Sequence, residues 1–404
     1  MELKKYKLGE ILDVTRGASL SGEFYATEGK YIRLTCGNFD YQNNCFKENK
    51  SKDNLYYIGD FKPEFLMEEG DIITPLTEQA IGLLGSTAII PESGKYIQSQ
   101  DVAKIICKEE LLDKDFVFYL ISSTLVKQQL SAAAQQTKIR HTSPDKIRDC
   151  TVWIPELTEQ KRIGKLLRSL DRKIELNRAI NQNLEAMAKQ LYDYWFVQFD
   201  FPNENGKPYK SSGGKMVWNE KLKREIPKGW NVLKLGEHCS FNKRTSNGYF
   251  NHPILYLDTS NITNNTIDEL QFLNPSSDII PSRARRLVQE GDIVYSTVRP
   301  NLKHFGIIMN PDYNMVVSTG FAVITANWSA YRYFIYQFLI QAATIENLST
   351  IAQSAVSAYP SINTSDIENL DLVVPPDSMI EKYAKTACRL YLQIDLNSAT
   401  LLQI

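Results

Sequence analysis

The stretch that decides the fold, residues 158–192, reads TEQKRIGKLLRSLDRKIELNRAINQNLEAMAKQLY. Apolar residues recur in it at steps of four and three, and neither proline nor glycine follows Gly164, which is typical of a long helix with one narrow apolar stripe. At 1.5 Å per residue such a helix is roughly 50 Å long. The predicted seam consists of Ile163, Leu167, Leu170, Ile174, Asn177, Asn181, Leu184, Ala188 and Leu191.

A second stretch, about residues 377–404, has the same spacing as the first, about residues 157–196. A narrow stripe needs a partner helix, so we expect the two stretches to pair, most simply antiparallel. Asparagine in such a seam is costly unless paired, and it often sets the register. The alternative is that each stretch is an ordinary core helix. The second seam consists of Tyr383, Ala387, Leu390, Ile394, Asn397, Leu401 and Ile404.

The chain repeats itself, with an offset that drifts only from 227 to 220 residues. An ordered series of matches at one period indicates duplication of a structural unit. The matching pairs are KLGE at 7–10 and 234–237, EGDI at 69–72 and 290–293, DKI at 145–147 and SDI at 365–367, WIP at 153–155 and VVP at 373–375, and IELN at 174–177 and IDLN at 394–397.

Each copy begins with a region rich in short apolar runs bounded by Gly, Pro, Asn and Asp, which predicts β-strands. Helices are expected late in each copy, at Lys114–Leu130 and Ala330–Glu346. A polar loop follows each of them, and the long helix comes after that. Between the copies, residues 201–214 are rich in Gly, Pro, Ser and Asn, as in a linker.

Length and composition limit the class of protein. The 404 residues suit two or three domains, and 43% hydrophobic and 23% charged residues indicate a water-soluble globular chain. The N-terminus lacks the apolar core of a signal peptide, so we expect a cytoplasmic protein. Six scattered cysteines without a C-x-x-C pair favour reduced thiols over disulfides or zinc. The net charge of −1 argues weakly against a nucleic-acid binder, although a local basic face matters more than the sum.

Several stretches resemble the specificity subunits of type I restriction–modification systems: IPELTEQ at 154–160, LYDYWF at 191–196, FDFP at 199–202 and REIPKGW at 224–230. Together with the repeat, the resemblance covers nearly the whole chain. The chain departs from the family pattern at the junction between the second β-rich region and its helix, VPPDSMI at 374–380. This junction lacks the Glu-Gln of the first junction, IPELTEQ. The second helix also ends at Ile404, near the point aligned with Leu184, so it is expected to be shorter than the first.

The resemblance implies an α+β protein with two repeated α/β target-recognition domains, separated by an antiparallel two-helix coiled coil with pseudo-twofold symmetry. We expect recognition domains at 1–155 and 213–375, a spacer helix and linker at 156–212, and a second spacer helix at 376–404. Each domain would read one half of a bipartite site in double-stranded DNA. Methyltransferase subunits, two in number, would dock on the helices, and restriction subunits would join them. Given the helix length, the half-site centres would lie roughly one to one and a half DNA turns apart.

In the second domain, a loop that follows the repeated Gly-Asp-Ile is the best candidate for reading DNA. Basic groups can hold phosphates while hydrogen-bonding groups read base edges. In the first domain the residues that follow Gly-Asp-Ile differ from those in the second domain. Lys138–Ser143 forms a further basic, polar loop in the first domain. An ordinary solvated loop is the alternative for each residue. The candidates are Arg33, Thr74, Thr77, Gln79, Lys138, Arg140 and His141 in the first domain, and Arg244, Arg283, Arg285, Arg286, Thr297, Arg299, Asn301, Lys303 and His304 in the second.

No catalytic motif is convincing. The chain has no G-x-x-x-x-G-K phosphate loop, its four histidines show no H-x-x-x-H spacing, and VPPD at 374–377 is a poor match to an adenine methyltransferase motif. We therefore expect no catalytic residues and no metal site. S-adenosylmethionine, Mg²⁺ and ATP would belong to partner subunits. Two rival hypotheses remain open: a coiled-coil adaptor that binds only protein, and the recognition part of a fused restriction–methylation enzyme.

Overall fold

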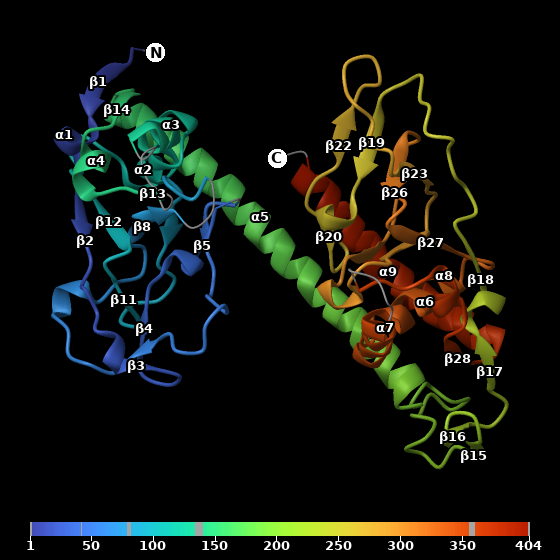
Figure 1. Cartoon of the computed structure of the whole chain (residues 1–404). Helices are drawn as coiled ribbons and strands as arrows, with labels where there is room; N and C mark the ends of the chain where they lie inside the picture. Colours follow the sequence, from blue (N-terminus) through green and yellow to red (C-terminus); the bar gives the residue numbers. More distant parts are fainter. Residues whose placement is uncertain (1, 42, 79–81, 134–139, 355–359, 403–404) are drawn as a thin grey trace. The chain divides into compact units, whose positions relative to one another are not determined.

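The computed structural model describes residues 2–41, 43–78, 82–133, 140–354 and 360–402 (Figure 1). The chain divides into two compact units, Met1–Lys173 and Ile174–Ile404. The division falls inside the long helix α5 (Leu157–Tyr192), so each unit contains part of that helix. None of the helices in these ranges is both long and apolar enough to cross a lipid bilayer.

Unit 1 is built around two four-stranded sheets. One has the order β10-β8-β12-β2, and all of its pairings are antiparallel. The other has the order β11-β4-β7-β3, in which β11 and β4 are parallel. The strands of these sheets are β2 (Leu12–Arg16), β3 (Tyr25–Ala26), β4 (Tyr31–Arg33), β7 (Tyr56–Tyr57), β8 (Ile72–Pro75), β10 (Ala88–Ile89), β11 (Tyr96–Ile97) and β12 (Val102–Cys107).

Three two-stranded pairs complete the strands described in unit 1. β1 (Lys4–Lys7) pairs with β14 (Thr151–Ile154), which brings the two ends of the segment before α5 together. The other pairs are β5 (Phe39–Asp40) with β6 (Cys45–Phe46), and β9 (Thr77–Glu78) with β13 (Arg140–His141). The short helices α1 (Leu8–Ile11) and α4 (Pro144–Arg148) pack beside β2, and Leu8, Ile11 and Ile147 are buried there.

Unit 2 repeats this plan, except that the fourth strand of its second sheet, β23, lies beside β26, whereas β3 of unit 1 lies at the other end of its sheet, beside β7. Its first sheet, β25-β24-β27-β18, has the same antiparallel order as β10-β8-β12-β2, and its second sheet again contains one parallel pair, β19 with β26. β17 pairs with β28 as β1 does with β14. The duplication inferred from sequence is thus a duplication of topology. The strands are β17 (Asn231–Lys234), β18 (Cys239–Phe241), β19 (Ile254–Leu257), β22 (Gln271–Leu273), β23 (Ala284–Leu287), β24 (Ile293–Ser296), β25 (Phe305–Ile307), β26 (Met315–Ser318), β27 (Phe321–Ala326) and β28 (Asp371–Val374).

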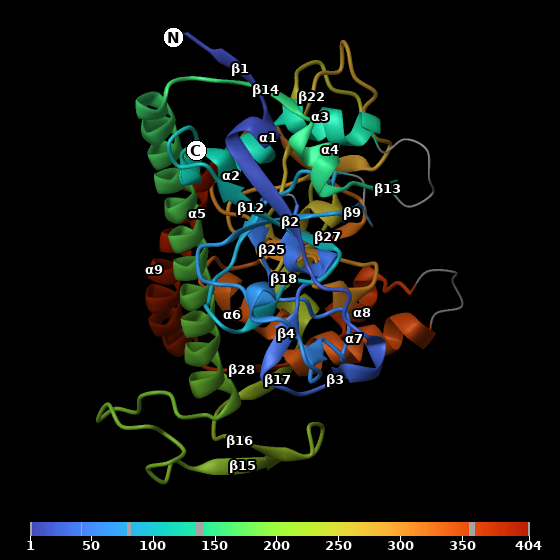
Figure 2. The same ribbon diagram turned by 90° about the vertical axis from the view of Figure 1, so that its left-hand side faces the viewer.

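Two hairpins of unit 2 lie outside these sheets. β20 (Ile262–Thr263) and β21 (Thr266–Ile267) form a hairpin with a two-residue loop, and β15 (Met216–Asn219) pairs with β16 (Arg224–Pro227) between the predicted linker and β17. Figures 1 and 2 both show β15 and β16 beyond the C-terminal end of α5. A short helix, α8 (Thr364–Glu368), precedes β28.

Each helix predicted late in a copy is in fact two helices, so that prediction was wrong in detail. Unit 1 has α2 (Lys114–Ile121) and α3 (Thr124–Ala133), and unit 2 has α6 (Tyr331–Leu339) and α7 (Ala342–Ser354). The break in unit 1 falls at two serines. The Ser122 hydroxyl donates back to the Phe118 carbonyl, while Ser123 Oγ accepts from Val126 N at the start of the next helix. Side chains that compete for backbone groups in this way favour helix ends.

The two long helices pair antiparallel within unit 2, as predicted (Figure 2). Tyr192 of α5 contacts Tyr383 near the start of α9 (Asp377–Leu402), and Asn181 lies against Asn397 near its end. The asparagines are paired: Asn397 Nδ2 donates to Asn181 Oδ1 at 2.9 Å, and Asn181 Nδ2 donates to Ser398 Oγ at 3.1 Å. The side chain of the predicted seam residue Leu401 lies outside the described residues.

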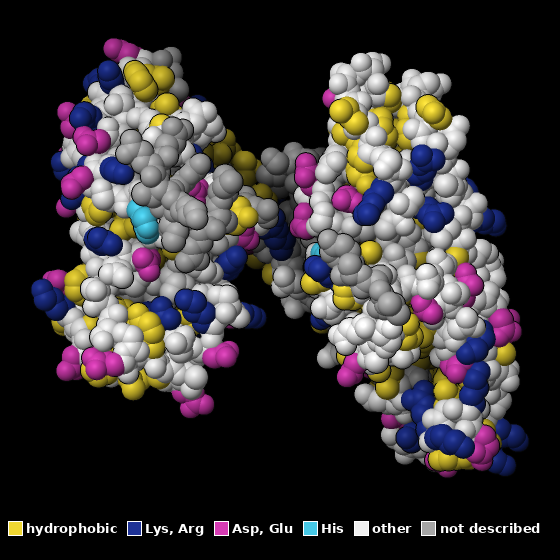
Figure 3. Space-filling model, viewed as in Figure 1, with side chains coloured by type: hydrophobic (Ala, Val, Ile, Leu, Met, Phe, Trp, Pro, Cys, Tyr) yellow, Lys and Arg dark blue, Asp and Glu magenta, His cyan; other side chains and the backbone are white. Residues whose placement is uncertain are grey.

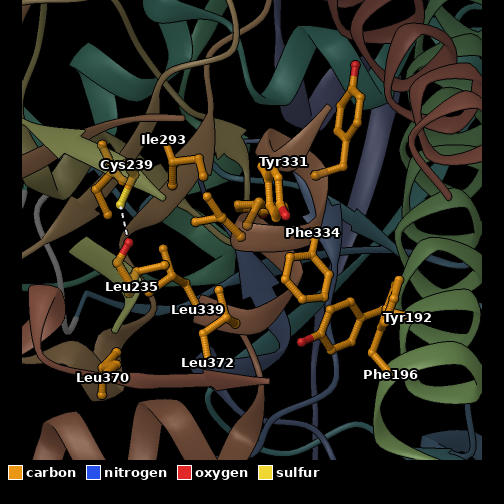
Figure 4. Close-up of a cluster of buried hydrophobic side chains, with 14 of the residues drawn as sticks. Tyr192, Phe196, Leu235, Cys239, Ile293, Tyr331, Phe334, Leu339, Leu370 and Leu372 are labelled. Carbon is orange, nitrogen blue, oxygen red and sulfur yellow. Dashed lines mark hydrogen bonds between the residues drawn. The ribbon is translucent and has the colours of Figure 1, made fainter. Parts of the chain in front are cut away.

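The helix pair is also packed against α6, so its apolar face is wider than a two-helix seam. Tyr391 of α9 stacks on Tyr333 with 5.0 Å between ring centroids, and its hydroxyl accepts a hydrogen bond from buried Gln337. Figure 4 shows Tyr192 and Phe196 beside Phe334 of α6, in the core of unit 2. The last turn before the linker is a π-helix, Asp193–Val197.

Candidate nucleic-acid interface

The repeated Gly-Asp-Ile motif builds the frame under each candidate loop. Gly70 and Gly291 have φ of 82° and 81°, which glycine adopts readily, so the chain can turn into the next strand. Asp71 Oδ2 accepts from Glu68 N in unit 1, and Asp292 Oδ2 accepts from Gln289 N in unit 2. The motif is therefore structural: it places the start of β8 or β24, and the loop comes after the strand.

Each aspartate also joins its turn to the neighbouring strand. Asp71 forms a 2.7 Å ion pair with Lys104 of β12, and Asp292 accepts from the Thr325 hydroxyl of β27 at 2.6 Å. Asp292 is 1% exposed, and it forms an ion pair with Arg244 as well. Arg244, predicted as a DNA contact, thus has its guanidinium engaged by a buried carboxylate.

In unit 2 the loop after β24 is held in a conformation that is unusual for its residues. A short 3₁₀ turn, Pro300–Leu302, is flanked by Arg299 and Lys303, with φ of 48° and 58°. The loop is anchored at both sides. Thr297 donates from its amide and its hydroxyl to the Gly320 carbonyl, and Arg299 N donates to the Pro360 carbonyl. Non-glycine residues with positive φ persist where the surroundings impose them, and they are common at functional sites.

The structure brings the exposed candidates of unit 2 to one place. The side chains of Arg299, Asn301 and Lys303 are exposed on this loop, and the side chain of Arg283 is exposed on the chain leading into β23. One turn connects them, because Thr319 N donates to the Arg283 carbonyl while Gly320 accepts from Thr297. His304 is turned back into the fold, where its Nδ1 lies 2.7 Å from the Ile262 carbonyl.

The other arginines of β23 hold the protein's own loops. Arg285 donates to the carbonyls of Ser282 and Asn247, which fixes the loop before Tyr249. Arg286 donates to the Thr245 hydroxyl, and burial lowers the pKa of its guanidinium. Both are half-buried, so the cluster of basic residues seen in the sequence separates into exposed Arg283 and two arginines with structural partners.

In unit 1 the two candidate loops, distant in sequence, form one strip. β9 pairs with β13, with Thr77 opposite His141, and the Thr77 hydroxyl lies 3.3 Å from His141 Nδ1. His141 is exposed. Unit 2 contains the counterpart, a bridge between Val298 and Ser361. Gln79 and Lys138 lie outside the described residues, and for Arg140 only the backbone is described.

Two candidates of unit 1 are buried rather than displayed. Arg33 is 7% exposed, and its guanidinium lies 3.8 Å from the centre of the Tyr25 ring and donates to the Asn54 carbonyl. Thr74 is 1% exposed and donates to the Ser86 carbonyl. Neither side chain reaches the surface in this structure, because each faces inward from its strand.

On the face drawn in Figure 3, basic side chains in unit 1 are scattered among acidic ones. In unit 2 they gather most densely over β15 and β16, and Lys210, Lys215 and Lys228 are exposed in this segment. Sequence analysis assigned most of this segment to the second recognition domain, which was predicted from residue 213, but named none of these lysines as a candidate. Within the described ranges no group of three or more His, Cys, Asp or Glu side chains is placed to hold a metal ion.

The fold contains two copies of one α/β frame. The copies differ in their exposed loops, and each is joined to a long helix. These features define a class of duplicated, two-domain proteins. The chain belongs to the type I restriction modification DNA specificity domain family, whose model matches residues 1–186 and 227–404.

Known specificity subunits are similar to the chain. It is 24% identical over 295 residues to the type I restriction enzyme MjaIX specificity subunit of Methanocaldococcus jannaschii, covering 70% of this chain and 64% of the relative. It is 29% identical over 172 residues to the HindI specificity subunit of Haemophilus influenzae, covering 42% and 37%. The matches thus span less than two thirds of either relative. The crystal structure of an S subunit from M. genitalium has the same fold, with a TM-score of 0.59 at 14% identity, covering 100% of this chain and 93% of that one.

Proposed function

We propose that this chain is the DNA specificity subunit of a type I restriction–modification complex, and that each unit reads one half of a bipartite site. The single observation that carries the proposal is that the two units share one strand-and-turn scaffold but differ in the exposed loops that it supports. The Gly-Asp-Ile turn is the same in both units, but the segments beyond it differ: in unit 1 Thr77 lies there, paired with His141 of β13, and in unit 2 the loop Arg299–Lys303 lies there. Two readers of different half-sites need such a shared scaffold and different contacts.

The chemistry of the loops suits DNA. Arg283, Arg299 and Lys303 carry positive charge on exposed side chains, and such groups hold phosphates or the acceptor edge of guanine. Asn301 and His141 are exposed groups that can hydrogen-bond to base edges. The rigid anchoring of the loop lowers the entropy lost on binding.

The helices supply the spacing and the partner surface. In unit 2, α5 exposes three large apolar residues, Leu176, Ile180 and Met187, on a face different from the one that carries Asn181 and Ala188, and Tyr194 is exposed in the π-helix that follows. Exposed apolar stripes of this kind are typical of protein–protein contacts. We assign this face to a methyltransferase subunit, with two such subunits and the restriction subunits in the full complex.

The chain itself catalyses no reaction in this proposal. S-adenosylmethionine, Mg²⁺ and ATP bind to the partner subunits, and the complex acts on DNA in the cytoplasm. The half-site centres lie roughly one to one and a half DNA turns apart, in line with a spacer helix of roughly 50 Å.

The test is to co-express the chain with its methyltransferase subunit and to map methylated adenines across the host genome. We expect a split motif with a fixed gap. Replacing residues 213–375 by the equivalent domain of a relative should change one half of the motif only. Methylation that does not depend on the chain would overturn the proposal and favour an adaptor that binds only protein.

A further inference from the structure

The hairpin β20–β21 lies between the long helices and the candidate DNA-reading loop of unit 2. Asn264 and Asn265 form its turn, with φ of 46° and 64°, and positive φ at both central residues is the signature of a type I′ turn. Asn265 N donates to the Phe305 carbonyl, and Asn264 N donates to the Lys303 carbonyl. The hairpin therefore touches both β25 and the last residue of the loop.

The hairpin fits closely against β25. A Cβ atom on Gly306 would lie 2.6 Å from Ile262 Cδ1 and 3.0 Å from Asn265 Oδ1, so a side chain at that position would force the two apart. On the other side of the hairpin, the His304 ring contacts the Ile262 carbonyl and the Thr263 hydroxyl. Any movement of the hairpin therefore moves the loop with it.

The side chain of Asn265 joins this assembly to helix α5. Its Oδ1 accepts from Ile307 N at 2.9 Å, and its Nδ2 donates to Glu185 Oε1 at 2.6 Å. The Glu185 side chain is half-buried, and burial raises its pKa to about 7. Its charge raises the pKa values of buried Tyr336 of α6 and of Tyr383 and Tyr391 of α9. A carboxyl is costly to remove from water, so its hydrogen bond to the turn asparagine is the feature that needs explaining.

A second contact of the same kind comes from the other long helix. Asn310, with φ of 44°, lies in the turn just after β25 and donates from Nδ2 to Asp395 Oδ2 of α9 at 2.5 Å. Each helix of the antiparallel pair thus offers one carboxylate to one turn asparagine, and the two turns flank β25. The strand that carries the loop is attached to both helices.

We propose that Glu185, supported by Asp395, is a positioning residue that fixes the Arg299–Lys303 loop relative to the helix pair and so determines how well unit 2 reads its half-site. The inference rests on the proposed function. In this assembly the docking of a methyltransferase on the helices and the reading of DNA by the loop are connected through Glu185, Asn265 and β25.

The experiment compares variants of the full chain, each co-expressed with the methyltransferase subunit. Asn265→Gly keeps the favourable Asn-Gly turn but removes both side-chain hydrogen bonds. Glu185→Leu removes the acceptor, and Glu185→Gln keeps an acceptor oxygen in place. Glu175→Leu on the exposed surface of α5 is the matched control. For each variant, methylation at correct sites is compared with methylation at sites mismatched in one half.

For Asn265→Gly and Glu185→Leu we expect the ratio of correct to mismatched methylation to fall by about tenfold, the size of one lost base contact, in the half read by unit 2. The ratio in the other half should stay unchanged. Glu185→Gln and Glu175→Leu should behave as the unmodified chain does. The half read by unit 2 is identified by Asn301→Ala.

Three outcomes would overturn the inference: an unchanged ratio in Asn265→Gly, an equal fall in both halves, or a Glu185→Gln variant as impaired as Glu185→Leu. The first would remove the hairpin from recognition, and the others would indicate a purely structural role. Failure of the proposed function is distinguishable from these outcomes, because the unmodified chain would then direct no split motif at all.

Discussion

Two residues of the candidate loop adopt a backbone that their side chains do not favour. Left-handed Arg299 and Lys303 each cost about 1 kcal/mol relative to glycine, and the anchors at Thr297, Pro360 and Ile262 hold them there. The strain turns two cationic side chains outward at the ends of a three-residue turn. Such a preorganised pair of charges is suited to a rigid, regularly spaced polyanion.

Replacement of Lys303 by alanine tests whether this loop holds phosphates. We expect weaker binding to all DNA sequences alike, and a plot of log affinity against log salt whose slope is smaller in magnitude by about one. Titration of fluorescent duplexes with the chain, alone and with the proposed methyltransferase partner, at several salt concentrations, measures both effects.

Arg285→Ala is the control for Lys303→Ala, because Arg285 donates to the backbone of its own unit. It should lower the thermal stability and leave the salt slope unchanged. A Lys303→Ala variant with the salt slope of the unmodified chain would remove this loop from the DNA contact.

The sequence indicated which loops carry basic and polar residues, but it did not indicate which of these side chains face solvent. Arg33 is the buried last residue of β4, Thr74 lies on β8, whose four residues are all buried, and Arg285 and Arg286 lie on a strand where they secure a neighbouring loop. Their burial depends on which strand lies beside them, and strand neighbours are set by contacts distant in sequence. The β9–β13 strip, which joins Thr77 to His141, is another product of such contacts.

At the scale of the element, the long helices were the most predictable part of the molecule. The four-and-three spacing gave α5 its bounds within a residue or so, and the seam asparagines correctly implied a partner. The pattern could not show that α6 joins the pair, because Tyr391 and Gln337 make their contact between segments 54 residues apart. It also could not show the breaks at Ser122 and at Ile340, where side-chain hydrogen bonds and caps outweigh the apolar pattern.

The asparagine pair in the seam predicts a particular pattern of stabilities. Asn181→Leu alone leaves the Asn397 amide without its partner and should lower the free energy of unfolding by about 1 kcal/mol. The double variant Asn181→Leu, Asn397→Leu should recover that loss, because two leucines pack favourably in a seam. A double-mutant cycle by chemical denaturation measures the coupling between the two positions.

The recovered stability should come with a loss of register. In the double variant the asparagine contacts no longer fix the axial alignment of α5 and α9, so cysteine pairs placed for two different registers should both crosslink. Additive losses in the two single variants would contradict a direct contact between Asn181 and Asn397.

At the scale of the whole molecule, the two frames are built separately. Asp71 contacts Glu68 and Lys104, which both lie in unit 1. Asp292 contacts Arg244 and Thr325, which both lie in unit 2. We therefore expect thermal unfolding in more than one transition, as multidomain chains commonly show.

Alanine at either aspartate should affect one transition only. Asp71→Ala and Asp292→Ala should each lower the midpoint of a different transition by about 5 °C, because each removes the acceptor of a turn amide and of a side chain on the neighbouring strand. Scanning calorimetry of the full chain distinguishes the two. A single transition, lowered by both variants, would show that the units unfold together.

The separate frames have a consequence for how such a protein changes over generations. Genetic recombination within the coding sequence of α5 would exchange one whole unit, together with the aspartate, the glycine and the anchoring residues that support its loop. The other unit would keep its own aspartate, glycine and anchoring residues. If each unit reads one half-site, as proposed, the hybrid would take one half of its target from each parent. Each new unit would then add as many new combinations as there are partner units, instead of one.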